Sequence, residues 1–453
     1  MRSRLIVGVL ALWSCQSAPQ PTQSNNPSDK DTLRALPPAL SPDPYWTDLS
    51  RILAGLLPRD TIYWRSAIRD TAWTNYATQV ERLWSKRKQA LYDSLLVWAA
   101  RELHPYHTWS GKVFYPFSGA DWATVYYTYP KGSFYLFFGL EQEGDPHYLR
   151  KLYPLDIVRN LRGTYLTLED LLRLSFFCTK DMQVQLAQGK VRGLLPVFLA
   201  LFARTGHLIY KVEHIYLKEG GVVDTLSPNK PKPAQSCWDN PITGLRFLVA
   251  RPEEPIQEIL YLSLNAANAG IQTQIGSRDI LSRMRPCVTL IKSASYLMYG
   301  PDFTEIRDLI LKQSVAILQE DSGMPFRSFD STAWHIQLFG VYEKPIPLFR
   351  SKFQSDLWKA YRTYPVKRLP FNIGYHVVPG QSNLLWAVRK NPQATLPPIP
   401  DGTKSAAQKQ SITPLPPRSI PMDTIWTALS LPPSDDSFKN LRPPTAAPFG
   451  GSE

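Results

Sequence analysis

The chain has 453 residues, of which 43% are hydrophobic and 12% aromatic, and its formal net charge is +13. This composition excludes an intrinsically disordered or collagen-like chain and allows a sizeable buried core. Only four cysteines occur, with no CxxC or HExxH motif, which excludes a disulfide-based fold and the common zinc motifs, so we expect no metal and no cofactor.

The N-terminus, residues 1–14, is typical of a secretory signal peptide. Arg2 and Arg4 precede a short apolar run, which lacks the roughly 20 residues that a membrane span needs. The sequence LWSC, ending at Cys15, resembles a bacterial lipobox, in which cleavage makes this cysteine the first residue of the mature chain. Acyl chains on Cys15, palmitate among them, would anchor the protein durably. Gln16 resembles the sorting signal for the outer membrane, so we expect a lipid-anchored, periplasm-facing protein of that membrane.

Composition divides the rest of the chain into a tether, a folded part and a tail. Residues 15–44 are rich in Pro, Ser, Asn and Gln and are typical of a flexible tether. The dense aliphatic and aromatic sequence that follows predicts two α+β lobes, residues 45–235 and 236–390, with mixed or antiparallel sheets and flanking helices. Residues 391–453 are rich in proline, and we expect a disordered tail.

Within the folded part, the spacing of apolar residues predicts helices and strands in blocks. Helices are expected at residues 74–103, from 167 onward, at 194–203 and at 303–312. Strands are expected at residues 113–117, 123–129, 133–140, 207–217, 244–250, 258–264, 315–320 and 334–342. The strand at 207–217 is expected to turn back at Gly220-Gly221 as a hairpin.

Two short polar motifs follow expected strands. Ser118 and Asp121 lie in PFSGAD, and Asp321 and Ser322 lie in EDSG. Catalytic groups are often carried by such loops, so a hydrolase that uses Ser118 or paired carboxylates is one interpretation. The other is that these are ordinary turn residues whose side chains cap backbone N–H groups. PFSGAD is not a GxSxG elbow, and the sequence favours the turn interpretation.

An acidic loop follows the expected strand at 133–140. Glu141, Glu143, Asp145 and His147 alternate with other residues. Four such side chains are able to hold a divalent cation, but the pattern is more typical of a solvated loop, which we favour.

The cysteines other than Cys15 allow at most one disulfide. Cys178 lies in the apolar run LLRLSFFC and is expected in the core. Cys237 and Cys287 flank loop signals, so they are the candidate pair.

The tail contains one apolar segment between prolines, PMDTIWTALSLPP. Ile425, Trp426 and Leu429 are its apolar residues, and one helical turn would place Ile425 and Leu429 on a common face. Such a segment commonly docks in a groove of its own domain or of a partner. The alternative is a hydrophobic cluster without a function.

Five motifs occur in order along the folded part: FYPFSGADW, FFGLE, LQEDSGMP, FNIGY and SNLLWA. Together they resemble a family of bacterial exported proteins and lipoproteins for which no activity is established. The resemblance covers roughly residues 73–388. It implies one conjoined fold and does not indicate any reaction.

Three classes of function are consistent with the sequence. The one it favours is an envelope lipoprotein with a structural, scaffolding or partner-binding role, held at the membrane through Cys15 and contacting an envelope protein or the cell wall. The second is a lipoprotein whose aromatic cleft binds a sugar or a peptide. The third is a hydrolase using Ser118, Asp121 and Asp321, so whether the chain is an enzyme stays open. The basic folded part suits an anionic surface, and an exported protein is not expected to bind nucleic acid.

Overall fold

The computed structural model describes residues 40–174, 186–187, 189–227, 241–376 and 381–391. Cys15, Cys178, Cys237 and the tail segment around Trp426 lie outside these ranges. Among the described helices, none combines the length and the hydropathy that crossing a membrane would require.

Helices and strands alternate along much of the described chain. The helices are α1 (Pro44–Leu53), α2 (Arg65–Ile68), α3 (Thr71–Arg87), the π-helical segment η1 (Lys88–Tyr92), α4 (Asp93–Glu102), α5 (Trp122–Thr128), α6 (Pro146–Lys151), α7 (Pro154–Val158), α8 (Arg162–Leu174), α10 (Leu195–Arg204), α11 (Asn268–Thr273), α12 (Ser277–Ser282), α13 (Thr304–Gln313) and α14 (Ser355–Thr363). The strands are β1 (Lys112–Tyr115), β2 (Phe134–Gly139), β3 (Leu208–Leu217), β4 (Val223–Thr225), β5 (Thr243–Ala250), β6 (Gln257–Ser263), β7 (Cys287–Ile291), β8 (Ser314–Gln319), β9 (Trp334–Gly340), β10 (Val366–Lys367) and β11 (Asn383–Arg389).

The described strands form one 11-stranded mixed sheet in the order β10-β9-β11-β8-β7-β1-β2-β6-β5-β3-β4. Its centre, β8-β7-β1-β2-β6, is parallel. On one side β11 runs antiparallel between β8 and β9, and on the other β5, β3 and β4 continue as antiparallel neighbours. The chain passes from β1 to β2 on one side and later enters β7 on the other, so its course across the sheet reverses beside β1.

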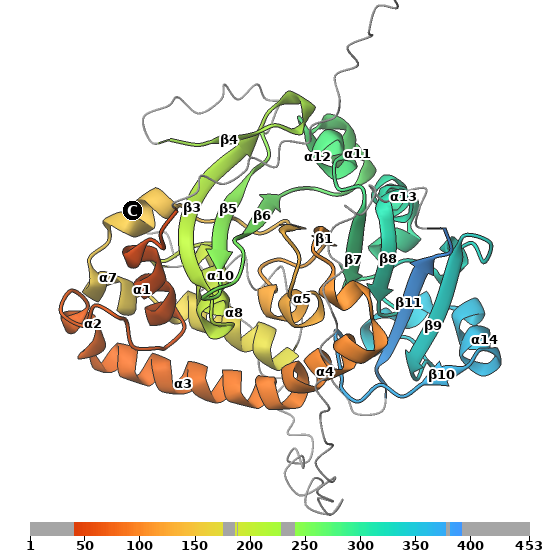
Figure 1. The fold of residues 1–453 in the computed structure, drawn as a ribbon, viewed down its shortest axis with the longest axis horizontal. Coiled ribbons are helices and arrows are strands. Elements are labelled where there is room, and N and C mark those ends of the chain that lie inside the picture. The colour runs from red at the N-terminus through yellow and green to blue at the C-terminus, as the bar shows by residue number, and fades with distance from the viewer. Residues whose placement is uncertain (1–39, 175–185, 188, 228–240, 377–380, 392–453) are drawn as a thin grey trace, which may run out of the picture. The chain divides into compact units, whose positions relative to one another are not determined.

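Helices cover both faces of the sheet (Figure 1), and each face has its own apolar core. Within β1, Val113 and Tyr115 contribute to one core and Phe114 to the other, because successive strand residues point to opposite faces. The first core contains residues of α1, α3, α4, α5, α8 and α10, and the second contains residues of α11 to α14. Burial on both faces explains why β1 and β2 are almost continuously apolar.

The predicted mixture of helices and a mixed sheet is confirmed, and so are most individual elements. The helix expected at 74–103 is present as α3, η1 and α4, and the hairpin after residue 207 is present as β3 and β4. One strand prediction, at residues 123–129, is wrong, because residues 123–128 belong to helix α5 and the helix ends there. Their β-branched and aromatic side chains suggested a strand, yet Asp121 caps the segment as a helix and its residues are buried almost all round, which removes helical periodicity.

The two expected lobes do not have separate sheets. In the described structure β1 of the first half lies between β2 and β7, and β7 comes from the second half. β2 pairs in turn with β6, also from the second half. The composition change near residue 236 therefore does not divide the sheet.

The candidate disulfide stays a prediction, and one of its two cysteines is Cys287. It is the first residue of β7, it is fully buried, and its thiol is free. Burial raises the pKa of this thiol to about 11. Its expected partner, Cys237, is outside the described residues.

Candidate functional site

The candidate site lies at the carboxyl edge of the five parallel strands. In open α/β sheets, ligands bind in the crevice at this edge where the strand order reverses. Here that place is between β1 and β7, and a cavity of about 200 Å³ is found there. Residues that follow β1, β2, β6 and β7 line the cavity.

The turn between β1 and α5 forms one wall. The Ser118 hydroxyl donates to the Tyr115 carbonyl at 2.6 Å, and both residues are buried. Asp121 caps α5 by accepting from the Thr124 hydroxyl at 2.9 Å and, more weakly, from the Thr124 N–H at 3.4 Å. The sequence candidates Ser118 and Asp121 thus hold the turn, as the turn interpretation expects, and both also line the cavity.

A buried ion pair joins this turn to the end of β7. The Lys292 ammonium contacts the Asp121 carboxylate, and both side chains are almost fully buried. The Tyr115 hydroxyl donates to the same carboxylate at 2.7 Å. Burial lowers the pKa of Lys292, and the charge of Asp121 opposes that shift. The pair bridges the two strands that flank the reversal point.

The loop after β7 has an unusual backbone. Five described residues other than glycine have φ in the left-handed region, and three of them are Ser293, Ser295 and Tyr296 in this loop. A fourth, Phe117, lies across the cavity in the β1–α5 turn, whereas the fifth, Glu253, lies in the β5–β6 turn. Each such conformation costs on the order of 1 kcal/mol and is found mainly where function requires it. The strain of the described backbone is therefore concentrated around the cavity.

Neighbouring side chains hold this loop in place. The Ser293 N–H donates to Glu320 Oε1 at 2.7 Å, and the Ala294 N–H donates to Ser322 Oγ at 3.0 Å. The Ser295 hydroxyl contacts the Tyr375 hydroxyl at 2.6 Å. The Ser293 hydroxyl, in contrast, is a buried polar group of the cavity wall without a hydrogen-bond partner in the described structure.

An acidic residue follows β2. Glu141 is buried and lines the cavity, and its carboxylate lies against Gly139 so closely that a Cβ there would be 2.3 Å from Glu141 Oε2. The rest of the acidic loop does not join it. Glu143 contacts His214 at 2.9 Å, and Asp145 caps α6. The cation site considered for this loop is thus not formed.

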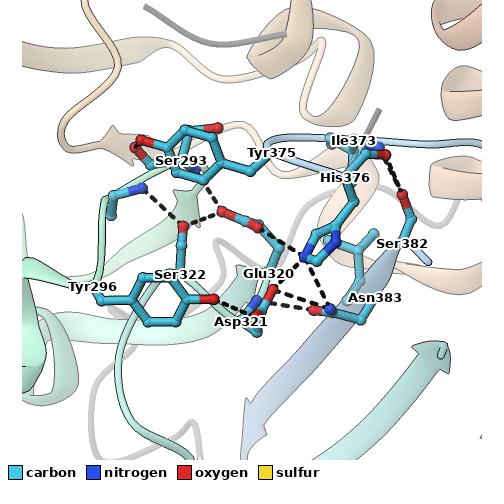
Figure 2. A network of polar contacts seen from close by, with 12 residues as sticks. Ser293, Tyr296, Glu320, Asp321, Ser322, Ile373, Tyr375, His376, Ser382 and Asn383 are labelled. Atoms are coloured by element: carbon cyan, nitrogen blue, oxygen red, sulfur yellow. Dashed lines mark hydrogen bonds and ion pairs between the residues drawn. The ribbon is translucent and has the colours of Figure 1, made fainter. Parts of the chain in front are cut away.

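A second polar cluster lies at the end of β8, next to the β7 loop. Figure 2 shows the carboxylates of Glu320 and Asp321 directed toward the His376 imidazole. His376 Nε2 contacts Asp321 Oδ1 in a short hydrogen bond and lies 3.6 Å from Glu320 Oε2. All three residues are buried. Among the described residues, they are the group whose donor atoms are close enough to share a metal ion.

The carboxylates and the imidazole influence each other's protonation. Burial and the charge of Asp321 raise the pKa of Glu320 to about 7, although His376 opposes the shift. Burial disfavours the charged form of His376, but the hydrogen bond with Asp321 and the two carboxylate charges outweigh burial and raise the pKa of His376. The protonation states of Glu320 and His376 are therefore linked.

The four catalytic candidates from the sequence lie in two different sites, the cavity and the polar cluster at the end of β8. Ser118 and Asp121 belong to the cavity, whereas Asp321 and Ser322 belong to the cluster at the end of β8. The Ser322 hydroxyl donates to Glu320, and Asp321 accepts from Asn383 Nδ2 at 3.0 Å. They are linked through the β7 loop but do not converge on one point.

Sequence reasoning missed three residues of these sites. Lys292 follows the apolar strand β7 directly, and His376 follows the FNIGY motif. Glu320 is the last residue of the apolar run VAILQE. A charged residue at the end of a fully apolar run was a usable signal for Lys292 and Glu320, because the end of a buried parallel strand is where functional groups lie.

Neither a protein-family model nor a curated protein nor a solved structure matches this chain. Its function is therefore inferred from the chemistry of the site.

Proposed function

We propose that the folded part binds a small organic molecule with neighbouring hydroxyl groups, a sugar or a nucleoside, in the cavity between β1 and β7. The observation that carries this proposal is the position of the cavity at the reversal point of a parallel sheet, with the strained residues gathered around it. The proposal favours the ligand-binding class over the scaffolding class that the sequence favours.

Two polar groups suit hydroxyls of the ligand. Glu141 follows the second strand of a strand–turn–helix–strand unit, about 20 residues after the turn, where an acidic residue accepts hydrogen bonds from ribose hydroxyls in dinucleotide-binding folds. Ser293 lines the same cavity, and its buried hydroxyl has no hydrogen-bond partner in the described structure. A buried hydroxyl in this state gains a hydrogen bond when a ligand supplies the other group.

The remaining lining fits a sugar or base rather than a phosphate or a peptide. Phe117 packs edge-on against Phe138 and Phe303, with ring centroids 5.2 and 6.3 Å apart, and all three line the cavity. Aromatic rings of this kind pack against the apolar faces of sugars and bases. The first turn of α5, where such folds hold phosphate, is occupied by the Asp121 carboxylate, which disfavours an anion. A volume of about 200 Å³ is small for a peptide.

The test is binding to the purified chain carrying Cys15→Ala, measured by calorimetry and thermal shift with monosaccharides, nucleosides and their deoxy counterparts. We expect one of the hydroxylated series to bind and its deoxy counterpart to bind less well. Glu141→Gln should weaken binding about ten- to a hundredfold, because a hydrogen bond to a charged acceptor is worth roughly 1.5–3 kcal/mol. Glu143→Gln, whose carboxylate contacts His214, is the matched control and should bind as the wild type does.

Comparison of the monosaccharides with the nucleosides shows which of the two classes of molecule binds. The proposal is wrong if neither series binds, or if Glu141→Gln binds its ligand with unchanged affinity while remaining folded.

We also propose that this binding takes place at the outer membrane, with the chain anchored through Cys15. The lipobox-like sequence supports the anchor. Docking of Ile425, Trp426 and Leu429 on an envelope partner stays a prediction, as does the scaffolding role.

A further inference from the structure

We propose that Glu320, Asp321 and His376 together bind one divalent transition-metal ion. Each residue offers one donor atom, and the three donor atoms all lie within 4.8 Å of one another. No local pattern in the sequence predicts this site, because His376 is 55 positions away from Asp321 in the chain. The inference does not depend on the identity of the ligand in the neighbouring cavity.

One carboxylate oxygen of this cluster has no hydrogen-bond partner in the described structure. Glu320 Oε1 accepts from the Ser293 N–H and the Ser322 hydroxyl, but Glu320 Oε2 is buried and has no hydrogen-bond partner in the described structure. This oxygen is directed toward His376 (Figure 2). A buried carboxylate oxygen without a partner is costly in free energy, and a cation held between it and the imidazole supplies the missing interaction.

The distance between Glu320 and His376 fits two ligands of one ion. Two ligands about 2.1 Å from a tetrahedral ion lie about 3.4 Å from each other. The observed distance between Glu320 Oε2 and His376 Nε2 is 3.6 Å. Asp321 Oδ1 is the third donor, and its hydrogen bond with the same nitrogen must open and lose its proton when the ion binds both atoms. Three protein ligands leave a coordination position open for water or a substrate.

Neighbouring side chains hold the residues of the cluster in place. Asn383 donates from Nδ2 to Asp321 Oδ1 at 3.0 Å and accepts from the Asp321 N–H at 2.9 Å, and the Tyr296 hydroxyl donates to Asp321 Oδ2. The Ser382 hydroxyl donates to the His376 carbonyl at 3.0 Å. Partners such as those of Asp321 fix the orientation of ligands in metal sites, whereas the bond from Ser382 holds the backbone of His376.

The charges of the cluster also suit a divalent ion. Two carboxylates and one imidazole are buried together, and a divalent ion with a neutral imidazole makes the set neutral. The nearby Lys292 is already paired with Asp121. A mixed set of oxygen and imidazole donors favours Zn²⁺, Mn²⁺ or Fe²⁺ over Mg²⁺ and Ca²⁺, which prefer oxygen donors alone.

The experiment uses the purified chain with Cys15→Ala, first treated with a chelator and then titrated with Zn²⁺ or Co²⁺. We expect saturation at one ion per chain by elemental analysis, a visible absorption band for the Co²⁺ form, and a rise in thermal midpoint that Mg²⁺ does not produce.

Glu320→Gln and His376→Gln should each weaken binding at least tenfold and remove the Co²⁺ band. Glu143→Gln and His214→Gln are the matched controls, because they change a carboxylate–imidazole pair outside the cluster. Folding of each variant is checked by near-ultraviolet circular dichroism.

The inference is overturned if the wild-type chain shows neither saturable binding nor a thermal shift with Zn²⁺ and Co²⁺. It is equally overturned if folded Glu320→Gln or His376→Gln binds the ion as the wild type does. The thermal shift of the wild type decides the question even where a variant fails to fold. Loss of sugar or nucleoside binding in Glu141→Gln, with metal binding retained, separates this inference from the proposed function.

Discussion

At the scale of single residues, the cavity wall depends on the charge balance around Asp121. Its carboxylate accepts from the Tyr115 hydroxyl and the Thr124 hydroxyl and is paired with Lys292. Removing one member of a buried pair leaves an uncompensated charge, at a cost of about 3–5 kcal/mol. Asp121 therefore acts first as a positioning residue, which keeps β1 and β7 in register beside the cavity.

A second buried group makes stability depend on pH. His207 Nδ1 contacts the Thr205 hydroxyl at 2.8 Å, and Nε2 contacts Gln257 Oε1 at 3.2 Å. Tyr126 packs against the ring, and Arg251 is the charged residue that acts on it. Burial, with a smaller contribution from Arg251, lowers the pKa of His207 to about 3.

We expect His207 to destabilise the folded chain in acid. The unfolded state binds a proton below a pKa of about 6.5, whereas the folded state stays neutral until about pH 3. Stability is therefore full above pH 6.5 and falls by about 1.4 kcal/mol per pH unit below it, or about 2 kcal/mol at pH 5. Denaturant unfolding at pH 7 and pH 5 of the wild type and His207→Gln measures the effect. Between pH 7 and pH 5, the free energy of unfolding of His207→Gln should fall by about 2 kcal/mol less than that of the wild type. Equal falls in both proteins would contradict the assignment of this effect to His207.

At the scale of elements, the loop after β7 should lower the stability of the free protein and favour binding of the ligand. Ser293 has φ of 54° and a buried hydroxyl without a partner. Both features cost free energy in the protein without its ligand.

Ser293→Gly should therefore stabilise the free protein by about 1 kcal/mol, since glycine accepts a positive φ and removes the hydroxyl. The same change should weaken ligand binding severalfold, because the ligand loses a hydrogen bond. Glu253→Gly is the matched control, since Glu253 has φ of 65° in the β5–β6 turn and does not line the cavity. It should gain similar stability with unchanged affinity. If Ser293→Gly is less stable than the wild type and binds the ligand with unchanged affinity, the strain of this loop does not serve ligand binding.

The elements themselves were largely predictable, because each pattern is local. β3 was recognised by the alternation of its sequence, and β2 was recognised as an apolar run of strand length. Helix α5 was not recognised, because a seven-residue helix that is buried nearly all round has the composition of a buried strand. The single signal for it was Asp121 as N-cap, and this residue was interpreted instead as a catalytic candidate or turn former.

At the scale of the whole molecule, pairing between distant strands defines both sites. β7 lies between β1 and β8, so Lys292 meets Asp121 across 171 positions of sequence. A short segment before β11 places His376 against the end of β8. Neither contact leaves a pattern in the local sequence. The turns PFSGAD and EDSG could therefore be identified from the sequence, but the residues that contact them could not.

The attachment of the whole molecule to a membrane is the last prediction. Two or more acyl chains on Cys15 would hold the chain durably, whereas the basic folded part alone would bind an anionic surface only while salt is low. We expect a labelled fatty acid to mark the protein in cells, and Cys15→Ala to abolish the label while Cys237→Ala keeps it. The unlabelled variant should bind anionic vesicles at low salt and be released near 0.5 M salt, where screening shortens to roughly 4 Å. Wild-type protein should stay with membranes at that salt concentration. Labelling that persists in Cys15→Ala would exclude this cysteine as the anchor, and salt-independent binding by the variant would show that charge is not what holds it.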